Sequence, residues 1–336
     1  MADFKKIKRT IIEKKLGYRK PKIDENSSKG EQFTLTLPIE IIRDMDITEI
    51  ERGVVLIYNP ISKEIKIKKK IWGGSMKTEI ISLVNPKGGA GKTVSAVNIA
   101  YALVNKGYKT LLIDSDPRSA IQVYLNIEND KTLYNLLENK YIDYTTKINV
   151  KDYAVNKNGL DVIIADDQLN EIEKVYKGDI ESELTCFADL DFQDYDFVVF
   201  DTEGTINNMT RAILRVTNYI LTPTQPSNID INGIRDLLEV VETAKRKNPS
   251  IEVKKIFLVR AKQQTNAYKS FSEQLKEIFD ENQFSETSIR EAQDVVNAMS
   301  EGLDIFSYKK SAGVAIDYKN LVDEFLEEIG TPEIIK

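Results

Sequence analysis

From residue 79 onward, short apolar runs alternate with longer segments whose apolar positions have helical spacing. The apolar runs predict strands at 79–84, 109–113, 161–164, 197–200, 218–221 and 256–259. The clearest helical patterns lie between them, at 93–105, 229–244 and 266–279. This alternation is typical of an α/β fold, in which helices cover both faces of a mostly parallel sheet and ligands bind at the carboxyl ends of the strands.

The chain before residue 71 has a different pattern. It predicts a small β-rich unit with strands at 33–37, 54–58 and 64–68 and a short helix at 39–45. A unit of about 40 residues buries too little apolar surface to be stable alone. We therefore expect it to be an obligate dimer.

These patterns divide the chain into four parts: a basic tail at 1–31, the β-rich unit at 32–70, a joint at 71–76 and the α/β domain at 77–336. The joint contains Gly73-Gly74-Ser75, a flexible composition, and Met76 follows at once. A methionine at this place looks like the natural start of a separate protein. Our hypothesis is that two reading frames were joined here, by nature or by a cloning linker.

Composition narrows the classes of function. With 41% hydrophobic and 30% charged residues the chain is typical of a globular protein, and it has no apolar run long enough to span a membrane. One cysteine, Cys186, and no histidine exclude an intrachain disulfide framework and a Cys/His zinc site, and favour a cytoplasmic setting. Residues 1–75 carry 17 basic and 11 acidic side chains, net +6, and the remainder 30 and 42, net −12. The basic part is thus expected to contact nucleic acid or the acidic part.

A glycine-rich loop follows the strand predicted at 79–84 and precedes the helix predicted at 93–105. Its sequence is Lys87-Gly88-Gly89-Ala90-Gly91-Lys92-Thr93. Glycines let backbone amides approach phosphate oxygens at the positive end of a helix. The Lys92 ammonium can then neutralise β- and γ-phosphates, and the Thr93 hydroxyl can bind Mg²⁺. The loop predicts an ATP and Mg²⁺ site.

Lys87 narrows the class of ATP-binding protein, because Lys-Gly-Gly-x-Gly-Lys-Thr resembles the deviant Walker A motif of the ParA/MinD family. The resemblance extends over residues 76–330 and implies a P-loop ATPase that forms an ATP-sandwich homodimer. It implies that Lys87 reaches the phosphates of the second subunit and takes part in catalysis with Lys92.

Two further segments resemble the switches of that family. Asp114-Ser115-Asp116-Pro117-Arg118 resembles switch I, which implies that Asp116 orients or activates the attacking water and that Asp114 helps to hold the metal environment. The segment 197–204 resembles Walker B with switch II, which implies that Asp201 holds Mg²⁺. Arg118 stands where the family usually has Gln, and Glu203 where it has Pro or Ala. These departures bear on the rate of hydrolysis. The family's adenine contacts correspond to Arg260 and to Asp304-Ile305-Phe306.

Other branches of the family fit less well. The amphipathic C-terminal segment 321–328 is acidic, so anionic lipid would repel it, and one cysteine cannot hold an iron–sulfur cluster. A metabolic ATP-dependent ligase stays an alternative. ParA-type members bind non-specific DNA as ATP dimers through late basic residues, and they move plasmid or chromosomal DNA. The candidates here are Lys245, Arg246, Lys247, Lys254, Lys255, Lys262, Lys269, Arg290, Lys309 and Lys310.

The β-rich unit at 32–70 is similar to the AbrB/SpoVT swapped-hairpin family through its segments 37–42 and 52–57. The resemblance implies a dimer with exchanged hairpins that binds DNA at specific sites. The expected function is therefore DNA partition with this unit as adaptor, and a separate centromere-binding protein as a further partner. The tail 1–24 would stimulate hydrolysis through Arg9 or Arg19. Transcriptional autorepression by the small unit is the alternative.

Overall fold

The computed structural model describes residues 53–59, 64–70, 78–142, 148–172, 187, 190–226, 228–262, 264–279 and 283–331. The chain divides into two compact units between Gly74 and Ser75, inside the joint predicted at 71–76. Each unit is treated by itself. The predicted tail 1–31, strand 33–37, helix 39–45 and joint 71–76 lie outside the described residues.

The described part of the first unit is an antiparallel strand pair. β1 (Gly53–Asn59) pairs with β2 (Glu64–Lys70), with Gly53 opposite Lys70 and Asn59 opposite Glu64. These strands contain the ones predicted at 54–58 and 64–68. The identity of the unit as an AbrB-like domain stays a prediction.

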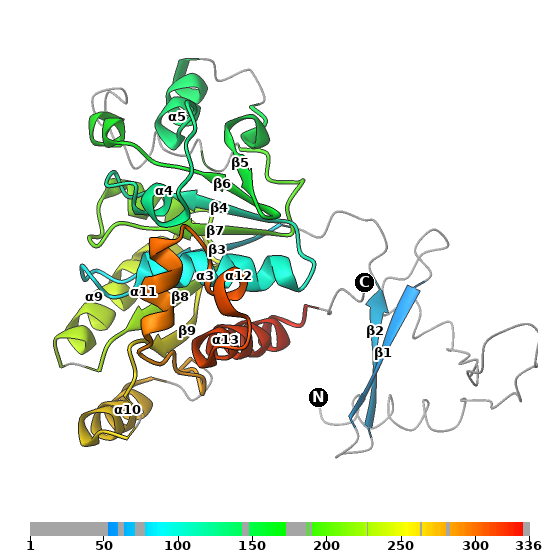
Figure 1. The fold of residues 1–336 in the computed structure, drawn as a ribbon, viewed down its shortest axis with the longest axis vertical. Coiled ribbons are helices and arrows are strands. Elements are labelled where there is room, and N and C mark those ends of the chain that lie inside the picture. Colours follow the sequence, from blue (N-terminus) through cyan, green and yellow to red (C-terminus); the bar gives the residue numbers. More distant parts are fainter. Residues whose placement is uncertain are drawn as a thin grey trace, which may run out of the picture. The chain divides into compact units, whose positions relative to one another are not determined.

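The second unit is built on a seven-stranded sheet in the order β5-β6-β4-β7-β3-β8-β9 (Figure 1). Its strands are β3 (Glu79–Leu83), β4 (Thr110–Asp114), β5 (Val155–Lys157), β6 (Leu160–Ile163), β7 (Phe197–Asp201), β8 (Tyr219–Thr224) and β9 (Glu252–Leu258). Every neighbouring pair is parallel except β5 with β6. The mostly parallel sheet and its six predicted strands are therefore confirmed.

The short edge strand β5 was not predicted. It forms a hairpin with β6 through Asn158 and Gly159, whose φ angles are +52° and +88°. Two consecutive residues with positive φ make the turn that joins two strands most tightly, and Asn-Gly is its preferred sequence. The dipeptide was a usable signal for this hairpin.

Helices cover both faces of the sheet, as expected. One face carries α3 (Lys92–Asn105), α4 (Ala120–Leu125), α11 (Gln293–Ser300), α12 (Ile305–Lys309) and α13 (Gly313–Ile329). The other carries α5 (Leu133–Ile142), α8 (Asn208–Leu214), α9 (Asn228–Lys245), α10 (Asn266–Ile278) and the 3-10 turns η1 (Val150–Tyr153) and η2 (Asp167–Glu171). No helix in the described residues is long and apolar enough to cross a membrane.

Strand β7 shows why its sequence is an uninterrupted apolar run. Phe197 and Val199 pack into the cluster beneath α3 and α13, whereas Val198 and Phe200 pack into the cluster beneath α5 and α8. All four are 0% exposed. A parallel strand buried on both faces needs apolar side chains at every position, so Asp201 at its carboxyl end stands out.

The C-terminal helix is fastened to the sheet by a buried ammonium. Lys255 on β9 is 2% exposed, and its Nζ pairs with Glu324 at 2.8 Å and with Glu328, both on α13. Glu324 also accepts a hydrogen bond from the Ser285 hydroxyl at 2.8 Å. Lys255, a candidate DNA contact by sequence, is therefore an internal residue.

Candidate nucleotide site

The glycine-rich loop connects β3 to α3 and its backbone requires glycine at two positions. Gly89 and Gly91 have φ angles of +73° and +87°, which side chains rarely adopt. A Cβ on Gly91 would also lie 3.3 Å from Cγ2 of Val259, at the end of β9. The Gln225 amide, after β8, donates to the Gly89 carbonyl at 2.7 Å. The segments that follow β8 and β9 thus pack against the loop, and α3 begins directly behind it.

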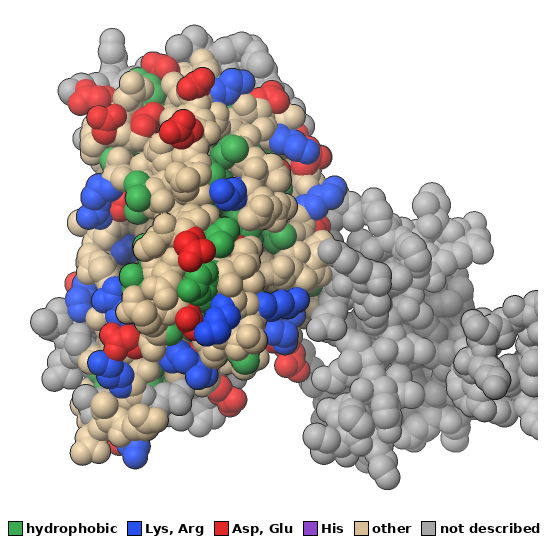
Figure 2. All heavy atoms as spheres, viewed as in Figure 1, with side chains coloured by type: hydrophobic (Ala, Val, Ile, Leu, Met, Phe, Trp, Pro, Cys, Tyr) green, Lys and Arg blue, Asp and Glu red, His purple; other side chains and the backbone are tan. Residues whose placement is uncertain are grey.

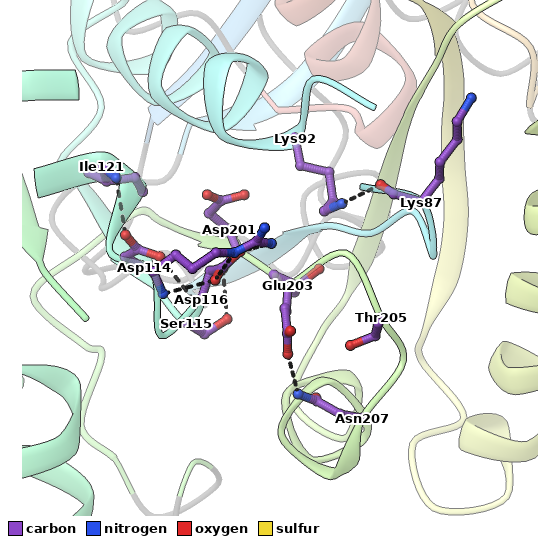
Figure 3. A network of polar contacts seen from close by, with 12 residues as sticks. Lys87, Lys92, Asp114, Ser115, Asp116, Ile121, Asp201, Glu203, Thr205 and Asn207 are labelled. Carbon is purple, nitrogen blue, oxygen red and sulfur yellow. Dashed lines mark hydrogen bonds and ion pairs between the residues drawn. The ribbon is translucent and has the colours of Figure 1, made fainter. Parts of the chain in front are cut away.

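The two lysines of the loop have different positions. Lys92 is buried, and its Nζ donates to the carbonyl oxygens of Asn85 and Lys87, each at 3.0 Å. Burial lowers the pKa of Lys92, while the carboxylates of Asp201 and Asp116 act in the opposite direction. The Lys87 side chain points away from both carboxylates (Figure 3). Only Lys92 therefore lies inside the site of its own chain.

Asp201 is the most unusual carboxylate in the site. It is 0% exposed, and neither of its carboxylate oxygens has a hydrogen-bond partner among the described residues. Burial raises its pKa, and the Thr93 hydroxyl and the Lys92 ammonium beside it act in the opposite direction. A buried carboxylate without partners is costly. Carboxylate and hydroxyl oxygens are ligands that Mg²⁺ prefers, so Asp201 and Thr93 fit this ion.

Asp114, at the end of β4, organises the chain after it. Its Oδ1 accepts a hydrogen bond from the Asp116 amide at 3.0 Å and its Oδ2 one from the Ile121 amide at 3.1 Å. Burial, and after it the charge of Asp201, raises the pKa of Asp114 well above its ordinary value. Both oxygens thus hold backbone amides of the switch I turn and the start of α4. Asp114 lies opposite Asp201 in the register of β4 and β7, and its predicted part in the metal environment stays a prediction.

Asp116 is held by Arg118. Its Oδ1 accepts from the backbone amide and from Nε of Arg118, at 3.0 and 3.1 Å, and its Oδ2 accepts from Nη2 at 2.9 Å. The Arg118 side chain is 71% exposed and that of Asp116 10%. Sequence reasoning named both residues but did not foresee that they bind each other.

The segment after β7 packs against the phosphate loop. The Thr202 hydroxyl donates to the Leu83 carbonyl at 2.7 Å, and the Asn207 amide donates to Glu203 at 2.7 Å (Figure 3). A Cβ on Gly204 would lie 3.1 Å from Cα of Gly88. Switch II and the loop therefore touch backbone to backbone.

An open cleft of about 650 Å³ lies between the loop and the two switches. Gly88, Asp116, Arg118 and Glu203 line it, together with Asp167 and Asn170 from η2. The last two were missed by sequence reasoning because they follow β6 in a segment with no motif. Asp116, the carboxylate predicted to orient the attacking water, therefore lines the same cleft as Gly88 of the loop.

The expected adenine contacts differ from each other. Arg260 directly follows Val259, the residue that Gly91 approaches, and it is exposed with a φ of +49°. Asp304 is 1% exposed and caps α12, because its Oδ1 accepts from the amides of Phe306 and Ser307 at 2.8 and 3.0 Å. The contact of Arg260 with adenine stays a prediction, and one oxygen of the Asp304 carboxylate is already used by its own helix.

Comparison with protein families decides the classification. Residues 78–253 match the family model described as AAA_31, AAA domain. The chain belongs to this family. It is a ParA/MinD-type P-loop ATPase, related to partition proteins. The matched region begins after the first unit, so the AbrB/SpoVT resemblance of residues 32–70 stays a prediction.

Curated relatives of this ATPase align over most of its second unit. The chromosome-partitioning ATPase Soj of Treponema pallidum is 28% identical over 255 residues, 74% of this chain and 96% of the relative. The sporulation initiation inhibitor protein Soj of Bacillus subtilis is 27% identical over 252 residues, 73% and 97%. The chromosome partitioning protein ParA of Caulobacter vibrioides is 28% identical over 195 residues, 53% and 68%.

Solved structures share the fold. Cobyrinic acid a,c-diamide synthase from Mycobacterium smegmatis with bound ADP and magnesium has a TM-score of 0.62 at 19% identity, covering 77% of this chain and 100% of the other. The septum site-determining protein MinD from Pyrococcus horikoshii, complexed with Mg-ADP, has a TM-score of 0.61 at 18% identity, with coverages of 77% and 100%. A plasmid partition protein from Borrelia burgdorferi has a TM-score of 0.59 at 21% identity, with coverages of 75% and 99%.

Proposed function

We propose that this ATPase is a DNA-partition protein that binds ATP with Mg²⁺, dimerises around it and hydrolyses it to ADP and phosphate. The observation that carries the proposal is Asp201, a fully buried carboxylate without a hydrogen-bond partner in the described residues, beside the loop lysine Lys92. Relatives named for chromosome partitioning support DNA as the cargo.

In this proposal each residue of the nucleotide site has its own role in binding or hydrolysis. Backbone amides of the loop bind phosphate oxygens, and Lys92 neutralises the β- and γ-phosphates. Thr93 and Asp201 hold Mg²⁺, which neutralises phosphate charge, and Asp114 positions the switch behind them. Asp116 orients the attacking water. Positioning and charge neutralisation are the main demands of phosphoryl transfer.

Lys87 is proposed to act on a second subunit. Its side chain points away from the carboxylates of its own site (Figure 3), which supports a role at the phosphates of a partner. Lys92→Ala should abolish ATP binding, whereas Lys87→Ala should keep it and lose ATP-dependent dimerisation in sedimentation velocity. Lys109→Ala, an exposed lysine at the start of β4, is the control and should dimerise normally. A Lys87 variant that dimerises as well as this control contradicts the sandwich model.

The proposed DNA surface lies at α8 and α9. Arg211, Arg215 and Lys247 line one small surface hollow, and the exposed Arg246 adjoins them in sequence. In Figure 2, which faces the layer of α11, α12 and α13, basic and acidic side chains lie side by side, so we look for the basic cluster on the other layer. Such a cluster gives the salt-sensitive, collective phosphate contacts of non-specific binding. Lys254, Lys262 and Lys309, three other candidates, are paired with acidic side chains.

DNA binding should depend on ATP and on this cluster. Replacing Arg211, Arg246 and Lys247 together by Gln should weaken binding of random-sequence duplex and lower the slope of log affinity against log salt by about 3, nearly one unit per lost phosphate contact. Lys254→Gln with Lys262→Gln and Lys309→Gln, three residues in ion pairs, is the matched control. Equal slopes for the two triple variants contradict the assignment of the surface.

We further propose that residues 32–70 bind a specific DNA site as the adaptor and that the tail 1–24 stimulates hydrolysis through Arg9 or Arg19. The net charge of +6 over residues 1–75 supports contact with nucleic acid. Footprinting on the DNA around the gene should protect tandem repeats. Protection confined to an operator that overlaps the promoter would favour autorepression instead. Deleting residues 1–24 should lower DNA-stimulated turnover, and unchanged turnover would reject the role of the tail.

A further inference from the structure

Two residues that depart from the family pattern line the same cleft with opposite charges. Arg118 lies on the switch I wall and Glu203 on the switch II wall, and Gly88 of the phosphate loop lines the cleft as well. The charges of Asp116, Glu203 and Asp201 all act on Arg118 and raise its pKa, Asp116 most strongly. The arginine is therefore placed at the point where switch I faces the phosphate loop.

Arg118 occupies most of the hydrogen-bonding capacity of Asp116. A carboxylate has about four lone-pair positions, and Arg118 donates to this one from its backbone amide, Nε and Nη2. A water molecule that needs Asp116 as its acceptor must compete with these three donors. In the described geometry, the carboxylate predicted to orient water is largely occupied.

The Arg118 side chain can exchange its hydrogen bonds to Asp116 for bonds to another acceptor at little cost. The Arg118 side chain is 71% exposed, and ion pairs at such exposure are weak because water screens them. Of the five N–H donors of a guanidinium, Asp116 uses the one on Nε and one on Nη2. The remaining three are available to another acceptor, and phosphate oxygens match the planar fork of arginine.

The acidic side chains that line the cleft would repel a bound phosphate unless a cation offset their charge. Asp116, Asp167 and Glu203 line it, and Arg118 is the one basic side chain among its described lining residues. The γ-phosphate of a nucleotide in the loop would meet three carboxylates at this end. Repulsion between these charges would be strong in a site partly shielded from water, and a mobile guanidinium at the rim can offset it.

We propose that Arg118 is a γ-phosphate ligand supplied by the same subunit, held on Asp116 until ATP binds and then transferred to the phosphate, which frees Asp116 for the attacking water. The inference rests on the ATP site proposed above. In the hydrolysis the water oxygen bonds to the γ-phosphorus and the bond from that phosphorus to the bridging oxygen breaks. ADP leaves with the electron pair, and the proton of the water passes to the released phosphate.

Binding of two nucleotides separates this inference from the ATP site itself. Calorimetry with Mg²⁺ would compare AMP-PNP and ADP for the full-length wild type, Arg118→Gln, Arg118→Lys and the control Lys151→Gln, an exposed lysine of η1 with the same charge change. Arg118→Gln should weaken AMP-PNP binding about ten- to hundredfold, as expected for the loss of a charge-assisted hydrogen bond, and leave ADP within about twofold. Arg118→Lys should lie between, because it keeps the charge without the fork.

The outcomes are distinct. A wild type that binds neither nucleotide overturns the proposed ATP site. A wild type that binds both, with an Arg118→Gln variant that loses the same factor for AMP-PNP and ADP or loses nothing, overturns only the role of Arg118. Turnover gives a second readout, since Arg118→Gln should also lower kcat. A higher kcat with unchanged AMP-PNP affinity would mean that Arg118 only restrains Asp116, and the proposed contact with phosphate would be wrong.

Discussion

Asp201 is the residue at which stability and site chemistry oppose each other. Asp201 is 0% exposed and has no hydrogen-bond partner among the described residues, and burial disfavours its charge more than Thr93 and Lys92 favour it. It nevertheless occupies the position where a Mg²⁺ ligand is useful. The apolar strand before it places Asp201, because Phe197 to Phe200 pack on both faces of the sheet and Asp201 follows at the carboxyl end of the strand.

Asp201→Asn should therefore stabilise the nucleotide-free protein. Below the unfolded-state pKa, near 3.8, the carboxyl is protonated in both states and contributes no penalty. Because burial raises its folded-state pKa, the folded protein loses stability as the pH rises toward and through that value. The variant should gain about 1–3 kcal/mol at neutral pH and little at pH 4.

Thermal melts without nucleotide or Mg²⁺, recorded from pH 4 to pH 8, would check this sign. Asp130→Asn, at an exposed position after α4, is the control and should show no gain that grows with pH. A variant destabilised at neutral pH would mean that Asp201 has partners in the apo protein that the described contacts do not contain.

At this scale the sequence predicted the residues of the site better than their contacts. The residues Lys87 to Thr93 and Asp201 stand in contiguous motifs, so their neighbours in space follow from their neighbours in sequence. The wall formed by Asp167 and Asn170 depends on how the segment after β6 folds back toward Asp116. No local pattern encodes that approach.

Among the elements, α3 is tied to its neighbours by a buried amide. Asn98 donates to the Tyr124 hydroxyl of α4 at 3.0 Å and accepts from the Ile305 amide of α12 at 2.9 Å. Asn98 and Ile305 are both 0% exposed. One side chain thus joins the helix behind the phosphate loop to the helix behind switch I.

Asn98→Ala should lower the free energy of unfolding by about 2–4 kcal/mol, because it leaves the buried amide of Ile305 and the Tyr124 hydroxyl without their partner. Tyr124→Phe removes only one of these bonds and keeps the ring, so it should cost about 1 kcal/mol. Urea titration of both variants measures the difference. Equal losses would show that the Ile305 amide finds another acceptor.

Element predictions succeeded where a segment had enough residues to show the pattern of its own type of element, and failed where it had too few. The buried run of β7 identified the strand without help from its surroundings, and the 14 residues of α3 covered several turns. The six residues of α4 and the three of β5 are too few to show a period. For β5 the turn residues Asn158 and Gly159 carried the information instead.

At the scale of the whole molecule, the main feature is the division of the chain into two compact units. The three apolar clusters that the described residues form lie within the second unit, and the division between units falls at Gly74 and Ser75. Pattern and composition predict a joint at 71–76, because Gly73 and Gly74 interrupt the apolar pattern there. The partner and the role of the first unit depend on contacts outside the described residues.

The fragment 76–336 should fold alone and bind nucleotide. Its melting temperature should lie within about 2 °C of the corresponding transition of the full chain, a difference below roughly 1 kcal/mol for a domain of this size. Calorimetry with Mg²⁺ and ADP should give the same affinity for both proteins. A fragment that melts many degrees lower would show that the first unit contributes to the core of the ATPase.

Lys255 has a consequence for how this ATPase could change over evolution. Glu324 and Glu328 add to the negative charge of α13, which would repel anionic lipid, and the same two carboxylates neutralise the ammonium buried under the helix. Mutations that replaced these glutamates by basic residues, so that α13 could bind a bilayer, would leave the Lys255 ammonium without a carboxylate. They would also weaken the packing of α13 on β9. Evolution toward membrane attachment would therefore pass through a less stable intermediate, unless Lys255 were replaced first.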